Sequence, residues 1–255
     1  MTLLQYFIAA LAAFAAGAVN ALAGGGTLIT FPTLTALGIP PVAANITSTV
    51  SLFPGYFGAT WAQRRDLKGQ GIRMRYVLPA AVVGGLCGGI LLLLSGEKIF
   101  KQLVPFLILF AALLLALAEP LRKRLAKNRA SEKGSSPHYL IAVPAIILAS
   151  IYGGYFGAGL SVIVLAFLAL IFEDSLTRLN ALKQSIAFAT NSAAAIFFLF
   201  SGLVNWGVAA VMAASALLGG IAGGKLAGRV NPTALRWIVV SIGVIISIIF
   251  FIQTF

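Results

Sequence analysis

The chain has 255 residues, of which 60% are hydrophobic and only 9% charged, and its mean hydropathy is +1.01. Soluble domains carry about 25% charged residues, so this composition excludes a soluble domain and indicates a polytopic membrane protein. The net charge of +12 does not indicate nucleic acid binding, because the basic residues cluster between apolar runs instead of covering a soluble face.

Apolar runs bounded by glycine, proline and charged residues predict an all-α protein with ten membrane segments. The predicted segments are residues 3–23, 27–38, 42–62, 74–94, 99–119, 139–152, 158–172, 178–200, 206–224 and 233–254. The first run lacks the basic leader and cleavage site of a secretory signal, so we expect it to be retained. The long polar stretch, "RKRLAKNRASEKGSSPH", predicts a linker at 121–138 between a first membrane repeat at 1–120 and a second at 139–255, which together form one transport domain.

The basic residues of the short loops orient the segments, because Lys and Arg accumulate on the cytoplasmic side. With the linker in the cytoplasm and all ten segments alternating, fifteen basic residues lie inside. Only Lys98 and Lys101 lie outside, in a loop expected at Ser95–Lys101. This predicts a multi-pass protein of the plasma (inner) membrane with both termini outside. A C-terminal reporter that is active only in the cytoplasm would contradict this orientation.

The two halves resemble each other at an offset of 135 residues. The run "GGLCGGI" at Gly84–Ile90 recurs as "GGIAGGK" at Gly219–Lys225, and the same offset pairs Ser48 with Lys183. An odd number of segments in each half places the halves in opposite orientations, which is a common plan for secondary transporters. An ordinary helical bundle with an old duplication is the alternative. Glycines four residues apart favour close helix packing in both runs.

Glycine clusters precede two short segments at corresponding positions of the halves. These candidates are Gly24, Gly25 and Gly26, followed by Thr27, in the first half and Gly157 and Gly159 in the second. The second segment is long enough for only about half a bilayer. The start of a half-helix presents free N–H groups and a partial positive charge, which predicts an anionic ligand. A tight turn or a close helix contact is an equal alternative.

Polar residues inside apolar segments are further candidates for lining a substrate path. They are Asn45, Thr47, Ser48, Asn180, Lys183 and Gln184. Asn180, Lys183 and Gln184 share a helix face, and we expect the Asn45–Thr49 stretch to face the same cavity from the other half. A lysine inside the membrane is costly and indicates function. Snorkelling to the cytoplasmic surface is its alternative, and hydrogen bonds between helices are the alternative for Asn45–Thr49.

The positions of the acidic, histidine and cysteine residues limit which functions the protein can have. All six acidic residues lie in loops or at segment ends, so no buried carboxylate is available for a proton or sodium relay. The single histidine, His138, lies in the linker and the single cysteine, Cys87, lies in an apolar run, so we predict neither a metal site nor a cofactor. An enzyme would have to pair a serine with Lys183, and we predict that the protein is not an enzyme.

Two sets of motifs carry a family resemblance: "AGGGTLITFPTLTALGIPPVAANITSTV" in the first half, and "NALKQSIAFATNSAAAIFFLFSGLVNWGVAA" with "GGIAGGKLAGRV" in the second. Together they resemble the TauE/SafE family of sulfite and organosulfur anion transporters. The second half carries a thinner glycine run, "YFGAGLS", than members with a triple glycine in both halves.

The resemblance implies an inner-membrane permease for sulfite, sulfonates or related compounds. We therefore expect a transporter that exports a small sulfur-containing anion, because an inside-negative potential favours outward movement of an anion by about 2.3 kcal/mol per charge per 100 mV. A passive anion channel or a carrier of small carboxylates is the alternative, and a scaffold without a ligand is a third. The expected partners are the small anion and the lipid bilayer, with no nucleic acid, and a homo-oligomer is left open.

Overall fold

The structure is a computed structural model that describes residues 1–22, 24–128, 139–226 and 232–255. All regular elements within these residues are α-helices, which confirms the all-α class. The helices are α1 (Leu3–Leu22), α2 (Thr27–Ala36), α3 (Pro41–Ala62), α4 (Gly71–Asn128), α5 (Tyr139–Tyr155), α6 (Leu160–Ile171), α7 (Leu176–Leu199), α8 (Trp206–Leu226) and α9 (Pro232–Thr254).

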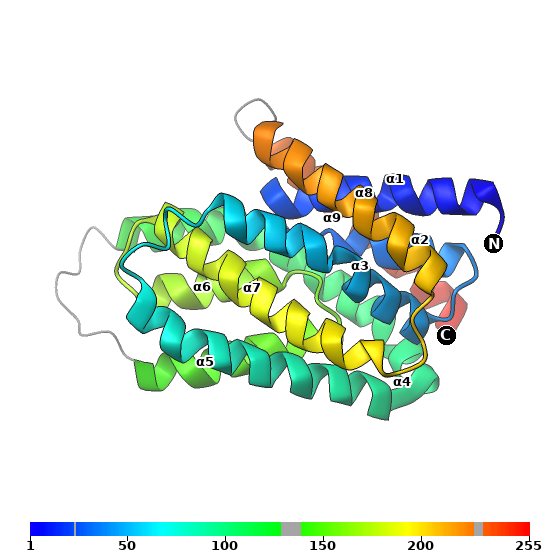
Figure 1. The fold of residues 1–255 in the computed structure, drawn as a ribbon, viewed down its shortest axis with the longest axis horizontal. Coiled ribbons are helices and arrows are strands. Elements are labelled where there is room, and N and C mark those ends of the chain that lie inside the picture. Colours follow the sequence, from blue (N-terminus) through cyan, green and yellow to red (C-terminus); the bar gives the residue numbers. More distant parts are fainter. Residues whose placement is uncertain (23, 129–138, 227–231) are drawn as a thin grey trace.

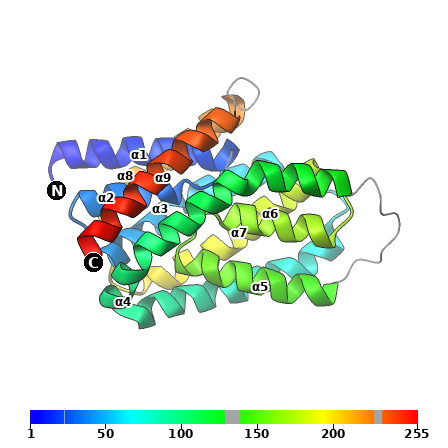
Figure 2. The same ribbon diagram turned by 180° about the vertical axis from the view of Figure 1, so that it is seen from behind.

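Helix α4 contains two of the predicted segments, separated by a single residue. Gly96 has φ +67° and ψ 180°, outside the helical region, and residues on both sides of it are helical. The sequence predicts a loop at Ser95–Lys101, but glycine reaches left-handed φ values readily and reverses the chain in one step. Both parts of α4 therefore run from this point back toward the same end of the molecule (Figures 1 and 2).

The helices lie roughly along the long axis of an elongated bundle (Figure 1). Both chain termini lie at one end, whereas the end of α4 and the start of α5 lie at the other. The short helices α2 and α6 lie toward opposite ends of the bundle. Below, the two ends are called the terminal end and the linker end.

Four of the described helical stretches are long and apolar enough to cross a membrane: Leu3–Ala21, Gly71–Ala118, Trp206–Gly223 and Thr233–Thr254. Large hydrophobic side chains such as Leu94, Phe110 and Ile252 are exposed on their surfaces, as is required of helices that face lipid. Helices α3 and α7 are equally long but carry buried polar residues, and they contact each other inside the bundle.

The contacts between helices follow the same plan in both halves. The most extensive contacts join α1 to α8 and α4 to α5, and the next join α3 to α8 and α4 to α7. The 135-residue offset relates α1 to α5, the first part of α4 to α8, and α3 to α7. Each of these contacts therefore has a counterpart, and each joins one half of the chain to the other.

The two glycine runs form the closest of these contacts, as the sequence predicts. A methyl group added to Gly88 would clash with the carbonyl oxygen of Ile151 on α5, and one added to Gly219 would clash with the carbonyl oxygen of Phe14 on α1. Such backbone approach is typical of small residues at membrane helix interfaces. We call the α4–α5 and α1–α8 contacts the glycine seams.

An ion-pair cluster joins two loops at the linker end. The carboxylate of Asp174, before α7, accepts hydrogen bonds from Arg73 at the start of α4 and from Arg178, whose Nε lies 2.9 Å from Asp174 Oδ1. Arg178 also donates to the carbonyl of Lys68 at 2.9 Å, and Gln70 donates to the carbonyl of Arg178 at 2.9 Å. Partial burial raises the pKa of Asp174, but the hydrogen bonds from the two arginines outweigh it and lower the pKa below its ordinary value of 3.8.

This lowered pKa makes the cluster's contribution to stability dependent on pH. The contribution is complete above the ordinary pKa and is lost as the pH falls below 3.8 through the lowered value. We expect Asp174→Asn to lower the free energy of unfolding by about 1–2 kcal/mol at pH 7, between the values for exposed and buried pairs. Thermal unfolding at pH 7 and pH 3 measures the effect, with Asp66→Asn as the control. An Asp174→Asn difference that is equally large at pH 3 would contradict this account.

Candidate functional site

Helical structure is interrupted between α1 and α2 at the predicted glycine cluster, and we call this interruption, like the one between α5 and α6, a break. Gly24 and Gly25 have φ values of +80° and +92°, a region that only glycine enters freely. The side chain of Asn20 holds the break, because its Oδ1 accepts a hydrogen bond from the amide of Gly26 at 2.8 Å. The amide of Gly24 donates to the carbonyl of Val19 at 2.9 Å. The Gly24 and Gly26 amides are therefore already used inside the chain.

The second break, between α5 and α6, has the same construction. Gly157 and Gly159 have φ values of +82° and +78°. The Tyr152 hydroxyl donates to the carbonyl of Ala158 at 2.7 Å and closes the turn. From the other half of the chain, Asn45 Nδ2 donates to the carbonyl of Tyr155 at 2.9 Å and so satisfies an open carbonyl at the end of α5.

The two breaks lie beside each other in the interior. A methyl group on Gly24 would lie 3.0 Å from Cβ of Ser161 on α6, and one on Gly157 would lie 3.8 Å from Oγ1 of Thr27 on α2. Thr27 and Ser161, which each lie in the first turn of a short helix, are both buried. The structure thus brings together two helix starts, each with a hydroxyl group, from opposite halves of the chain.

The predicted polar residues of α3 lie on the side of the breaks that faces the terminal end. Ser48 Oγ lies 2.6 Å from Oγ1 of Thr30 on α2. Thr47 Oγ1 accepts a hydrogen bond of 3.1 Å from the amide of Asn205, which lies beyond the end of α7. Asn45, Thr47 and Ser48 are completely buried. Helix contacts therefore use much of the hydrogen-bonding capacity of this group.

The predicted polar residues of α7 lie on the opposite side, toward the linker end. Asn180 Nδ2 donates to Oε1 of Gln63 at the end of α3 at 2.8 Å, and the carbonyl of Gln184 accepts from the hydroxyl of Thr60 at 3.2 Å. Lys183 is only 7% exposed. Lys183 is therefore buried over most of its side chain.

From the sequence we expect the polar residues of α3 and α7 to face one cavity. In the structure the two groups lie apart. The two helices run antiparallel (Figure 1). Residues that the 135-residue offset matches therefore do not lie side by side along the two helices. Asn180 lies beside Gln63, which is about 27 Å along α3 from Asn45 at 1.5 Å per residue. The groups therefore lie at different positions along the bundle, and Asn45 of the α3 group contacts the second break through the Tyr155 carbonyl.

Two of the predicted candidates carry a buried polar atom with no hydrogen-bond partner among the described residues: Asn45 Oδ1 and Gln184 Nε2. The hydrogen bond from Asn45 Nδ2 to the Tyr155 carbonyl fixes the orientation of the side-chain amide, so Oδ1 of Asn45 points away from Tyr155. An unpaired buried acceptor or donor costs about 1–3 kcal/mol. One free acceptor and one free donor, in different halves, are suited to a polar species that passes through the bundle.

Thr30 and Ser161 are not among the predicted candidates, because they read as ordinary residues of short apolar helices. Their roles arise from contacts between distant parts of the chain, so helix periodicity does not reveal them. Gly159, two residues before Ser161, is the local signal that marks that serine. In the part of the chain that the structure describes, no group of three or more His, Cys, Asp or Glu residues is placed to hold a metal ion.

Comparison with known families identifies the family of this chain. A family model described as "Sulfite exporter TauE/SafE" matches residues 9–250, nearly the whole chain. The chain belongs to the TauE/SafE family. This membership establishes a membrane transporter and not an enzyme, and it agrees with the apolar helices of the fold.

Curated proteins similar to this TauE/SafE chain carry the same general description. A "Probable membrane transporter protein" of Haemophilus influenzae is 29% identical, over 89% of this chain and 87% of its own length. The "Probable membrane transporter protein ORF9" of a Sinorhizobium species is 26% identical over 93% and 88% of the two chains. The "Probable membrane transporter protein YfcA" of Escherichia coli K12 is 26% identical over 95% and 86%. No solved structure matches the chain.

Proposed function

We propose that the protein exports a small sulfur-containing anion, such as sulfite or a sulfonate, across the plasma membrane. The observation that carries this proposal is the meeting of two helix starts, behind Gly24–Gly26 and Gly157–Gly159, in the buried interior of a TauE/SafE family member. Helix starts carry partial positive charge and suit an anion. Thr27 and Ser161 add hydroxyl groups beside them.

The transport unit consists of two inverted repeats, residues 1–120 and 139–255, which operate as one domain. Support comes from the paired helix contacts of the two halves and from the opposite placement of α2 and α6. The linker end faces the cytoplasm and both termini face outward. The loop between α3 and α4 and the start of α7 lie at the linker end (Figure 1). They carry Arg64, Arg65, Lys68 and Arg178, which support this orientation through the positive-inside bias.

The anion passes the two polar groups in sequence. From the cytoplasm it meets the α7 group, where Lys183 supplies the positive charge and Gln184 Nε2 a free donor. It then crosses the paired breaks and reaches the α3 group with Asn45 and Ser48. The separation of the two groups supports a path with consecutive contacts in place of one symmetric site.

Flux into proteoliposomes tests the function. We expect sulfite to move faster than a carboxylate of similar size, such as acetate, and an imposed potential to change the rate because net charge moves. Equal rates for sulfite and acetate would favour the alternative, a passive anion channel or a carboxylate carrier. Sulfite transport without any response to the potential would contradict potential-driven export, and absence of flux with any anion would favour a scaffold.

A further inference from the structure

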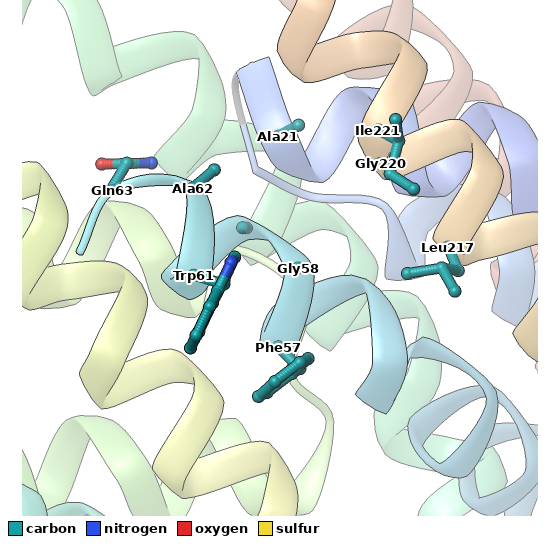
Figure 3. A pocket seen from close by; sticks show the side chains of 10 residues that line it. Ala21, Phe57, Gly58, Trp61, Ala62, Gln63, Leu217, Gly220 and Ile221 are labelled. Carbon is teal, nitrogen blue, oxygen red and sulfur yellow. The ribbon is translucent and has the colours of Figure 1, made fainter.

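A cavity of about 580 Å³ lies away from the paired breaks, between α1, α3 and α8. Its lining is almost entirely apolar and includes Phe57, Trp61, Leu217 and Ile221, with Gln63 at one end. Figure 3 shows Phe57 and Trp61 on α3 across from Leu217 and Ile221 on α8. An apolar lining does not suit the transported anion, because it offers few polar groups to replace water.

The cavity opens toward the flank of the bundle. Phe57 is 51% and Trp61 60% exposed, although both line it. Glycines keep it open: the nearest atom to a methyl group on Gly58 would be Leu217 Cδ1 at 3.7 Å, and the nearest to one on Gly220 would be 3.9 Å away. In a membrane, a lateral apolar opening of this kind is in contact with acyl chains.

Basic residues follow directly in the chain after the lining residue Gln63. The guanidinium of Arg64 lies 4.7 Å from the centre of the Trp61 ring and donates a hydrogen bond of 3.0 Å to the Trp61 carbonyl. Arg65 and Lys68 follow in the same short loop and are exposed, and the single acidic residue between them is Asp66. The positive charges therefore lie where the headgroup of a lipid would be if its chain occupied the cavity.

We propose that this cavity and loop form a binding site for one anionic phospholipid. The acyl chain lies against Phe57, Trp61 and Leu217, and the phosphate contacts Arg64 and Arg65. Charge complementarity favours an anionic lipid over a zwitterionic one, because each basic residue near an anionic membrane surface contributes about 1 kcal/mol, which is about five-fold in affinity. This site is separate from the proposed transport path, and its test requires no transported substrate.

Fluorescence of Trp61 tests the site in the full-length protein. In a Trp206→Phe, Trp237→Phe background, Trp61 is the single tryptophan, and brominated acyl chains quench it on contact. We expect brominated phosphatidylglycerol to associate at least about five-fold more strongly than brominated phosphatidylcholine. Arg64→Gln with Arg65→Gln should bring the ratio near one, whereas Arg75→Gln, an exposed arginine at the start of α4, should leave it unchanged.

Two outcomes would overturn the proposal. Equal association of the two lipids with the parent protein would mean that neutral chains fill the cavity without headgroup selection. An unchanged ratio in the double arginine variant would mean that the basic loop does not contact the headgroup. Gly58→Leu provides a separate test, because it fills the cavity and should reduce quenching by both lipids. Undiminished quenching would place the chain on the outer surface and overturn the cavity site.

Discussion

Replacing Lys183 with methionine should reduce sulfite flux in proteoliposomes by about 10- to 100-fold. The range corresponds to the loss of one hydrogen bond to a charged group, about 1.5–3 kcal/mol. Methionine keeps the length and the apolar stem of the side chain but removes the charge, and Lys183 is almost fully buried. The variant therefore tests the charge at the inner part of the proposed path with little change in packing.

Two control variants separate a transport role from a structural one. Lys98→Met removes an exposed lysine of α4 and should leave flux unchanged. Lys183→Arg retains the positive charge and should restore part of the flux. A folded Lys183→Met protein, judged by its thermal unfolding, that transports sulfite at the parent rate would contradict the proposed path.

Replacing Gly219 with alanine should destabilise the protein by roughly 3 kcal/mol, the upper part of the usual range for an overpacked core. The new methyl group would lie against the backbone of α1, where it would clash with the Phe14 carbonyl oxygen and come within 2.9 Å of Phe14 Cα. Backbone atoms cannot rotate away as a side chain does, so α1 and α8 must separate. Thermal unfolding in one detergent measures the difference.

The neighbouring glycine provides a matched control for this prediction. The nearest atoms to a methyl group on Gly220 would be 3.9 Å away. Gly220→Ala should therefore leave the unfolding temperature unchanged or raise it, because alanine is favoured over glycine in a helix by up to about 1 kcal/mol. Equal destabilisation by the two substitutions would show that the seam is not the cause.

The sequence predicts the helical segments well because each is bounded by local signals. Glycine and proline residues and charged loops mark where α3, α7, α8 and α9 begin and end. The predicted loop at Ser95–Lys101 is wrong because one glycine, Gly96, reverses α4 without interrupting the helix on either side. The packing role of the glycine runs is confirmed by their close contacts with neighbouring helices. It could be predicted because a four-residue spacing places glycines on one face of any helix.

The candidate site is less accessible from the sequence. Glycine clusters indicate the two breaks, but their contact across the interior depends on how distant helices pack. The 135-residue offset pairs Ser48 with Lys183, but α3 and α7 are antiparallel, so the matched residues are separated along the helices. The polar residues expected to line one common cavity therefore form two separate groups. The transport roles of Lys183, Gln184 and Asn45 stay predictions.

The glycine seams also bear on how the chain is assembled. Helix α1 packs against α8, and the first part of α4 packs against α5, so each seam needs one helix from each half. The seam face of α1 therefore has no partner until Trp206–Leu226 has been synthesised. The proposed repeats, residues 1–120 and 139–255, are therefore not parts that complete their own packing. Neither half contains both sides of a glycine seam, so neither half can form a seam alone.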